Sequence, residues 1–128
     1  MANGLNGTSL GGYGREIYKR YHYTCVYCGF DGRVFDNWMQ LSIDHIFPRN
    51  HPRGADRKSK ENMVVACRAC NSITSRMEFP KNATREDILR EKRAKVAERR
   101  KVFYDQWSSD VAPSYLERPL PKLRKQAT

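Results

Sequence analysis

Long hydrophobic runs are missing from this sequence. No window approaches the 18 or so consecutive apolar residues that a membrane-spanning helix needs. The first residues, Met1 to Gly7, have neither the basic start nor the apolar stretch of a secretory signal peptide. We therefore expect a soluble, cytoplasmic protein without a membrane partner.

Cysteine is scarce, and its placement is informative. All four cysteines lie in two Cys-x-x-Cys pairs, Cys25/Cys28 and Cys67/Cys70. A secreted disulfide protein more often spreads its cysteines, so this pattern favours a metal in a reducing compartment. Four such sulfurs can close a tetrahedral zinc site with bonds of about 2.3 Å. The stretch between the pairs is longer than the roughly 15 to 20 residues of a simple zinc ribbon. We therefore expect structural Zn²⁺ to clamp the two ends of a larger unit.

Acidic residues are also in short supply. The 128 residues include 24 Lys and Arg against 14 Asp and Glu, which gives a formal net charge of +10. Such an excess favours a polyanionic partner, either nucleic acid or an anionic membrane face, and does not determine the fold. The length of 128 residues predicts one small domain, and the hydrophobic fraction of 39% predicts a small core of the kind that often relies on a metal or on disulfides.

Composition divides the chain into four parts. Residues 1–13 are rich in Gly, Asn and Ser and predict a flexible N-terminal arm. Residues 14–80 form the predicted domain with the zinc site, residues 81–110 a basic helix packed on or beside it, and residues 111–128 an extended, proline-containing basic tail.

Inside the domain, the pattern predicts a ββα unit in an α+β fold, preceded by a short helix within residues 15–23. Residues 41–46 and 63–66 are β-rich and predict two strands, and a helix is expected from Cys67 until Pro80 stops it. The apolar group Val34, Phe35, Trp38 and Met39 is expected in the core.

The last helix is predicted to begin after Thr84, because Asp87 three residues later resembles a capping box, and to run to about Trp107. Leu89, Val96, Phe103 and Trp107 lie near one face. The basic residues around that face fit a solvated helix surface and phosphate contacts equally well.

Several ordered motifs resemble one family. Cys-Val-Tyr-Cys-Gly at 25–29, Ile-Asp-His-Ile-Phe-Pro at 43–48, Glu-Asn-Met at 61–63 and Cys-Arg-Ala-Cys-Asn at 67–71 look like the HNH endonucleases that carry a four-cysteine zinc site. The resemblance covers roughly residues 15–80. Asp-His alone would occur by chance, whereas Asp-His-x-x-Pro between two Cys-x-x-Cys pairs is a specific signal.

The resemblance implies a small ββα-metal (His-Me finger) domain that cleaves phosphodiester bonds with a divalent metal. Carried over by position, His45 is the general base, Asp44 and Asn71 are ligands of catalytic Mg²⁺ or Mn²⁺, and Asn62 holds the loop backbone that orients His45. The four cysteines bind structural zinc. One departure is Thr74, since family members often have lysine a few residues after the last Asn. The phosphate contact of that lysine must come from Arg76 or from elsewhere, or be absent.

The residue chemistry agrees with these roles. A negatively charged phosphodiester needs a cation at the phosphate and a base for the attacking water. Oxygen ligands such as those of Asp44 and Asn71 suit Mg²⁺ or Mn²⁺, and histidine is a neutral acceptor near pH 7. Adjacent strand residues point to opposite faces, so Asp44 and His45 can share a site only if the strand ends or twists there.

The leading hypothesis is therefore a metal-dependent endonuclease that cuts DNA. The alternative is a non-enzymatic four-cysteine zinc module that binds DNA or RNA, and a scaffold bound to acidic lipid is a third, weaker reading. His22 and His51 are expected at the surface. The fold does not fix the biological role, and proteins of phages or mobile elements are further partners that the resemblance suggests. The expected nucleic-acid contacts are Arg49, Arg53, Arg57, Lys58, Arg76, Arg93 and Arg100.

Overall fold

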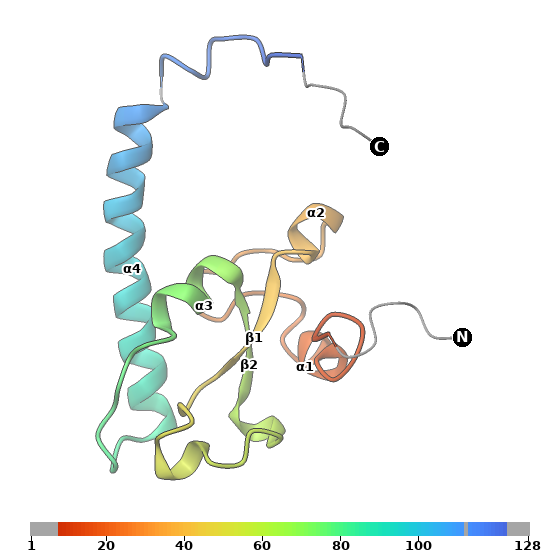
Figure 1. Cartoon of the computed structure of the whole chain (residues 1–128), viewed down its shortest axis with the longest axis vertical. Helices are drawn as coiled ribbons and strands as arrows, with labels where there is room; N and C mark the ends of the chain where they lie inside the picture. The colour runs from red at the N-terminus through yellow and green to blue at the C-terminus, as the bar shows by residue number, and fades with distance from the viewer. Residues whose placement is uncertain (1–7, 112, 123–128) are drawn as a thin grey trace.

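Two antiparallel strands form the centre of the protein (Figure 1). The computed structural model describes residues 8–111 and 113–122. Strand β1 (Leu41–His45) pairs with β2 (Met63–Cys67) in a register that places Leu41 opposite Cys67 and His45 opposite Met63. Helix α3 (Arg68–Thr74) follows β2 directly. The predicted α+β fold class, with its ββα unit and long C-terminal helix, is confirmed.

Strand β2 is buried along its whole length because both faces of the sheet are covered. Val64 and Ala66 face the cluster that includes Ile88 and Val96 of helix α4 (Arg85–Asp110). The alternate residues Met63 and Val65 face a second cluster with Ile17 and Tyr18 of helix α1 (Arg15–Arg20). The continuous apolar run in β2 is what a strand between two layers requires.

The first cysteine pair lies in a tight turn after α1. Gly29 has φ +79°, a backbone conformation that favours glycine, and its amide donates to the Cys25 carbonyl at 2.9 Å. The Cys25 amide in turn donates to the Phe30 carbonyl at 3.0 Å. The turn is tied to the sheet because the Val26 amide donates to the Val65 carbonyl at 3.0 Å.

The long loop between the strands contains two short 3₁₀ helices, η1 (Pro52–Gly54) and η2 (Lys60–Asn62). Its chain is folded tightly, since a Cβ on Gly54 would lie 2.0 Å from the Pro48 carbonyl oxygen. His51 is buried here, with Nε2 2.9 Å from the Pro80 carbonyl oxygen and Nδ1 accepting from the Arg53 amide. The expectation that His51 lies at the surface is therefore wrong; it links this loop to the segment before α4.

Helix α4 begins at the predicted capping box, in which the side chains of Thr84 and Asp87 accept from each other's backbone amides. Its first half packs on the ββα unit, and its second half extends past α3 (Figure 1). The predicted apolar face is buried only in part. Val96 is buried, whereas Phe103 and Trp107 are 53% and 41% exposed.

Three further expectations differ from the structure. Of the apolar group at helix α2 (Phe35–Trp38), only Trp38 packs against the core, because Phe35 is 68% and the preceding Val34 61% exposed. Helix α3 ends at Thr74, so Met77 lies outside it. Residues 8–13 form turns instead of a free arm, and the hydroxyls of Ser9 and Tyr18 are hydrogen-bonded at 2.7 Å.

The remaining end segments complete the description. Residues 1–7 of the expected arm lie outside the described part of the chain, as do 112 and 123–128 of the expected tail. Residues 113–122 are exposed; they form a turn and then continue without regular structure. Within the described ranges, no helix combines the length and apolar character needed to cross a membrane.

Candidate functional site

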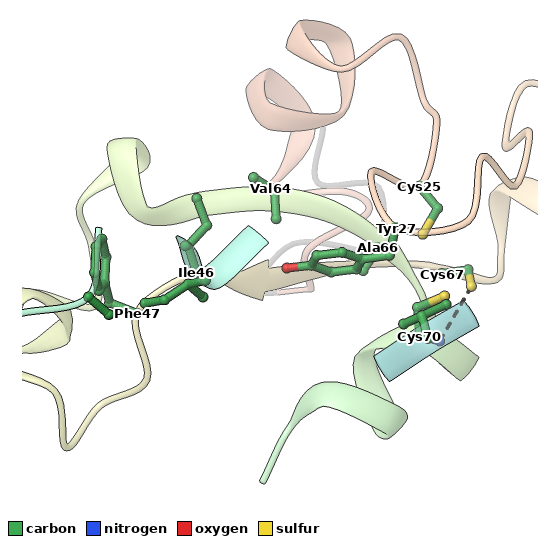
Figure 2. Packing of buried hydrophobic residues seen from close by; sticks show 11 residues of the cluster. Cys25, Tyr27, Ile46, Phe47, Val64, Ala66, Cys67 and Cys70 are labelled. Atoms are coloured by element: carbon green, nitrogen blue, oxygen red, sulfur yellow. Dashed lines mark hydrogen bonds between the residues drawn. The ribbon is translucent and has the colours of Figure 1, made fainter. Parts of the chain in front are cut away.

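The four cysteines come together where the turn after α1 meets the start of α3. Their sulfur atoms all lie within 4.8 Å of one another, and none forms a disulfide. The Cys28 and Cys67 sulfurs are 3.8 Å apart, close to the ~3.8 Å separation in a tetrahedron of thiolates bonded to zinc at about 2.3 Å. Figure 2 shows Cys25, Cys67 and Cys70 at one end of the buried cluster. The donor set and its spacing fit zinc.

The thiols of the cysteine cluster differ in pKa. Hydrogen bonding from Cys67 lowers the pKa of Cys25 to about 4. Burial raises the pKa of Cys70 to about 12, and the Cys25 thiolate acts in the same direction. Thiolates are the metal-binding form of cysteine, so at least one sulfur is ready for a cation before the others lose their protons.

A second site lies at the opposite end of the sheet. A cavity of about 370 Å³ is bordered by Asp44 and His45 from the end of β1 and by Asn71 from α3. Strand β1 ends at His45, which meets the condition that allows two adjacent residues to border one cavity. The structure therefore brings together the three side chains that the resemblance placed in the catalytic centre.

The Asp44 carboxylate is held by one of its two oxygens. Oδ2 accepts hydrogen bonds from the Tyr27 hydroxyl and, at 2.9 Å, from Lys92 Nζ. Burial raises the pKa of Tyr27, as does the nearby carboxylate, so the phenol stays protonated and donates. Among the described residues Oδ1 has no partner, and no fully buried side-chain oxygen there lacks one. Oδ1 therefore keeps contact with solvent.

Asn71 is fixed through its amide nitrogen. Nδ2 donates to Ser42 Oγ at 3.0 Å and to the Ile43 carbonyl at 3.2 Å. Because a carbonyl only accepts, the nitrogen must face β1 and the amide oxygen must face away from it. Within the described part of the chain, that oxygen has no hydrogen-bond partner. Asn71 and Asp44 thus each offer one oxygen, the ligand type that Mg²⁺ and Mn²⁺ take.

His45 is oriented by the long loop. Its Nε2 lies 3.1 Å from the Arg57 carbonyl oxygen, so Nε2 must carry the proton and Nδ1 the lone pair. Burial of the ring lowers the pKa of His45 below its usual 6.5, although the hydrogen bond to Arg57 acts in the opposite direction. The imidazole is therefore neutral at pH 7, with Nδ1 able to accept a proton.

Asn62 makes the backbone contacts expected for a residue that holds this loop. Its side chain is buried, Oδ1 accepts from the Phe47 amide at 2.7 Å, and Nδ2 donates to the Phe47 carbonyl at 3.0 Å. The backbone carbonyl of Asn62 also accepts from the Ile46 amide at 2.9 Å. Asn62 thus fixes the two residues that directly follow His45.

Some of the predicted nucleic-acid contacts gather at the cavity. Arg49 and Arg57 line it, and a neighbouring cavity of about 560 Å³ shares His45 and both arginines and adds Lys58 and Lys60. These four cations, Arg49, Arg57, Lys58 and Lys60, are called the basic rim below.

The other predicted contacts lie apart from the basic rim. Arg53 stacks over the Phe47 ring and borders a different cavity. Arg76 is exposed beyond α3, and Arg93 donates to the Val26 carbonyl at 3.0 Å. Arg100 is on the distal half of α4 near Phe103.

Sequence reasoning missed Tyr27 and Lys92. Tyr27 stands between two cysteines of a metal-binding pair, and Lys92 is one of many basic residues in the last helix, so neither is conspicuous in the sequence. A signal was present for Lys92, since Ile88, Lys92 and Val96 recur every four residues and so share one helix face. A lysine on the buried stripe of a helix needs a partner.

Comparison with known proteins gives one match. The family model for HNH endonuclease matches residues 25–76, the segment that contains both cysteine pairs and the three residues at the cavity. No curated protein and no solved structure matches the chain. The match confirms the recognition made from the motifs and indicates a nuclease-type function, and the four cysteines could hold zinc.

Proposed function

We propose that this chain, whose residues 25–76 match the HNH endonuclease family, is a metal-dependent endonuclease that hydrolyses phosphodiester bonds of DNA. The observation that supports it most is the convergence of Asp44, His45 and Asn71 on one cavity. This convergence puts a neutral base beside two free oxygen ligands. A zinc module that only binds nucleic acid has no need for that arrangement.

His45 has the position and tautomer of a general base. Its Nε2 proton is engaged by the Arg57 carbonyl, so Nδ1 takes a proton from a water molecule in the cavity. As the imidazole becomes positively charged, the same carbonyl stabilises it. General-base catalysis of this kind contributes about 10²- to 10⁴-fold to the rate.

Asp44 Oδ1 and Asn71 Oδ1 would hold the divalent cation, with water in its other positions. When bound, Mg²⁺ or Mn²⁺ supplies positive charge at the phosphate and at the departing 3′ oxygen. The residues fit this role because both oxygens belong to side chains already fixed by other hydrogen bonds.

The basic rim would hold the DNA backbone on either side of the reacting phosphate. Contacts of this kind carry no sequence information and weaken as salt rises, because binding releases counterions from the DNA. Arg49 and Arg57 border the cavity itself, so they are the cations best placed to contact the phosphate to be cut.

The test is incubation of supercoiled plasmid with zinc-loaded protein and Mg²⁺ or Mn²⁺. We expect nicked or linear DNA with the wild type and a loss of cutting with Asp44→Asn, at equal zinc content. A wild-type protein that binds the plasmid but leaves it intact with every metal would establish the alternative, a non-enzymatic zinc module.

A further inference from the structure

Lys92 connects helix α4 to the cavity. Its side chain is 3% exposed, and it lies 48 residues from Asp44 in the sequence. Nζ is 2.9 Å from Asp44 Oδ2 and 2.9 Å from the backbone carbonyl oxygen of His45. The ammonium group also lies 5.8 Å from the Tyr27 ring and 5.9 Å from the Phe79 ring. One lysine thus contacts both residues at the end of β1.

Tyr27 completes the arrangement from a different segment of the chain. It lies in the turn between Cys25 and Cys28, and its ring is buried in the cluster shown in Figure 2, between the cysteines and Ile46. Its hydroxyl donates to the same Asp44 oxygen that Lys92 contacts. Two donors from separate segments therefore share Oδ2.

We propose that Lys92 and Tyr27 are positioning residues that clamp Asp44 through Oδ2 and thereby present Oδ1 to the divalent cation. This inference rests on the proposed function and extends it to Lys92, which lies outside the matched segment, and to Tyr27, which lies between the first two cysteines. Through its second contact, Lys92 also fixes the backbone of His45. The spatial relation between the cation ligand and the general base is then set by a side chain of α4.

Stability alone does not explain this clamp. A buried ion pair is often no more stabilising than apolar side chains of the same size, because both charges lose their hydration. Here both donors are on one oxygen, and the other oxygen keeps solvent contact beside a cavity that also contains His45 and Asn71. Carboxylates that bind metals are commonly held by such outer hydrogen bonds, whose loss costs about 10- to 100-fold in metal affinity or activity.

The decisive measurement is the affinity of the zinc-loaded full chain for Mn²⁺. Electron paramagnetic resonance measures this affinity, because it reports the concentration of Mn²⁺ that stays free. We expect Lys92→Met and Tyr27→Phe each to weaken Mn²⁺ binding by about 10-fold or more, with Lys92→Met having the larger effect. Lys101→Met is the matched control, because it removes a lysine from the exposed face of the same helix; it should bind Mn²⁺ as the wild type does. Asp44→Asn alters the proposed ligand itself, so the Mn²⁺ binding that this variant loses is the binding at this site.

Two outcomes would overturn the clamp. Tighter Mn²⁺ binding by Lys92→Met would show that the ammonium competes with the cation, and unchanged binding by both variants would show that the contacts only support the fold. If Lys92→Met loses zinc or unfolds, Tyr27→Phe decides, since it keeps the ring and leaves the Asp44–Lys92 pair intact. Plasmid cutting by the wild type is scored separately, so a protein that binds Mn²⁺ at Asp44 without cutting would contradict the proposed function and not the clamp.

Discussion

The four-cysteine cluster and the cavity at the end of β1 differ in how they are built. The cluster supplies four ligands of one kind, which is a full set for zinc. The cavity supplies two protein oxygens and a histidine, and leaves room for water and substrate. A closed ligand set is typical of a structural metal, and an open one of a catalytic metal. On this contrast we propose a folding role for the first site and a chemical role for the second.

The two sites also differ in how far apart in the sequence their residues lie. Each cysteine pair is local, and only the meeting of the two pairs depends on the fold. Asp44, by contrast, is held by Tyr27 from the cysteine turn and by Lys92 from α4. The cavity therefore depends on the completed fold, including the cysteine cluster, whereas the cysteine cluster does not depend on the cavity. Substitutions in the cysteine cluster should therefore affect both sites, whereas substitutions at the cavity should leave the cysteine cluster intact.

The largest effect is expected from Cys67→Ser. It removes one sulfur of the cluster at the junction of β2 and α3, and structural zinc supplies about 10–16 kcal/mol of apparent folding free energy in small zinc domains. We expect loss of zinc and of a cooperative thermal transition. The control is Ser72→Ala on the exposed side of α3. If Cys67→Ser melted like the wild type, the cysteine cluster would not be needed for folding, and the proposed difference between the two sites would be wrong.

His45→Ala should act on chemistry alone. We expect the cleavage rate at saturating Mg²⁺ to fall by about 10²- to 10⁴-fold, with zinc content, melting temperature and DNA affinity nearly unchanged. His22→Asn is the matched control, because His22 is exposed with φ 54° and asparagine tolerates that conformation. Cutting at the wild-type rate by His45→Ala would refute the base assignment.

Asn62→Ala should lower both the stability and the cleavage rate, the stability by less than loss of a cysteine does and the rate by less than loss of the His45 ring does. It leaves the Phe47 amide without its side-chain partner, which costs about 1–3 kcal/mol for a buried group, and leaves the Phe47 carbonyl with only the 3.3 Å hydrogen bond from Arg57. We expect that loss in urea unfolding, together with slower cleavage because His45 is less well oriented. Asn50→Ala, in the exposed part of the same loop, serves as the control. A loss of stability without any change in rate would limit Asn62 to a structural role.

The pH dependence should be the mildest of these effects. Burial lowers the pKa of His45 below 6.5, and only the neutral ring can accept a proton. The midpoint of the decline in cleavage rate on acidification should therefore lie below pH 6.5. Rates measured at saturating metal test this, and the residual rate of His45→Ala should lack that decline. A decline centred above pH 6.5 would contradict the effect of burial.

The sequence predicted the parts of the molecule whose signals are local. Both strands, the capping box at Thr84 and the two cysteine pairs follow from short patterns, and the family motifs located Asp44, His45 and Asn71. The exposure of Phe35 was not predictable in the same way, because an apolar residue is equally compatible with a core and with a surface until the neighbouring elements are placed.

The partners of the side chains that support the cavity could not be predicted for a related reason, even where the spacing of Ile88, Lys92 and Val96 marks Lys92 as buried. Lys92 is one basic residue among many in α4, and its partner is 48 positions away. His51 gave no sign that it would be buried against the Pro80 carbonyl. Such contacts depend on how the α4 helix and the long loop pack on the sheet, which no short pattern in the sequence determines.

The most direct test of the account is the chemistry of the cut. Labelled duplex DNA is incubated with zinc-loaded protein and Mg²⁺, and the ends are identified for the wild type and for His45→Ala. Departure of the 3′ oxygen predicts 5′-phosphate and 3′-hydroxyl ends, produced by the wild type and nearly absent with the variant. DNA left intact by the wild type in both Mg²⁺ and Mn²⁺, or fragments with 3′-phosphate ends, would contradict it.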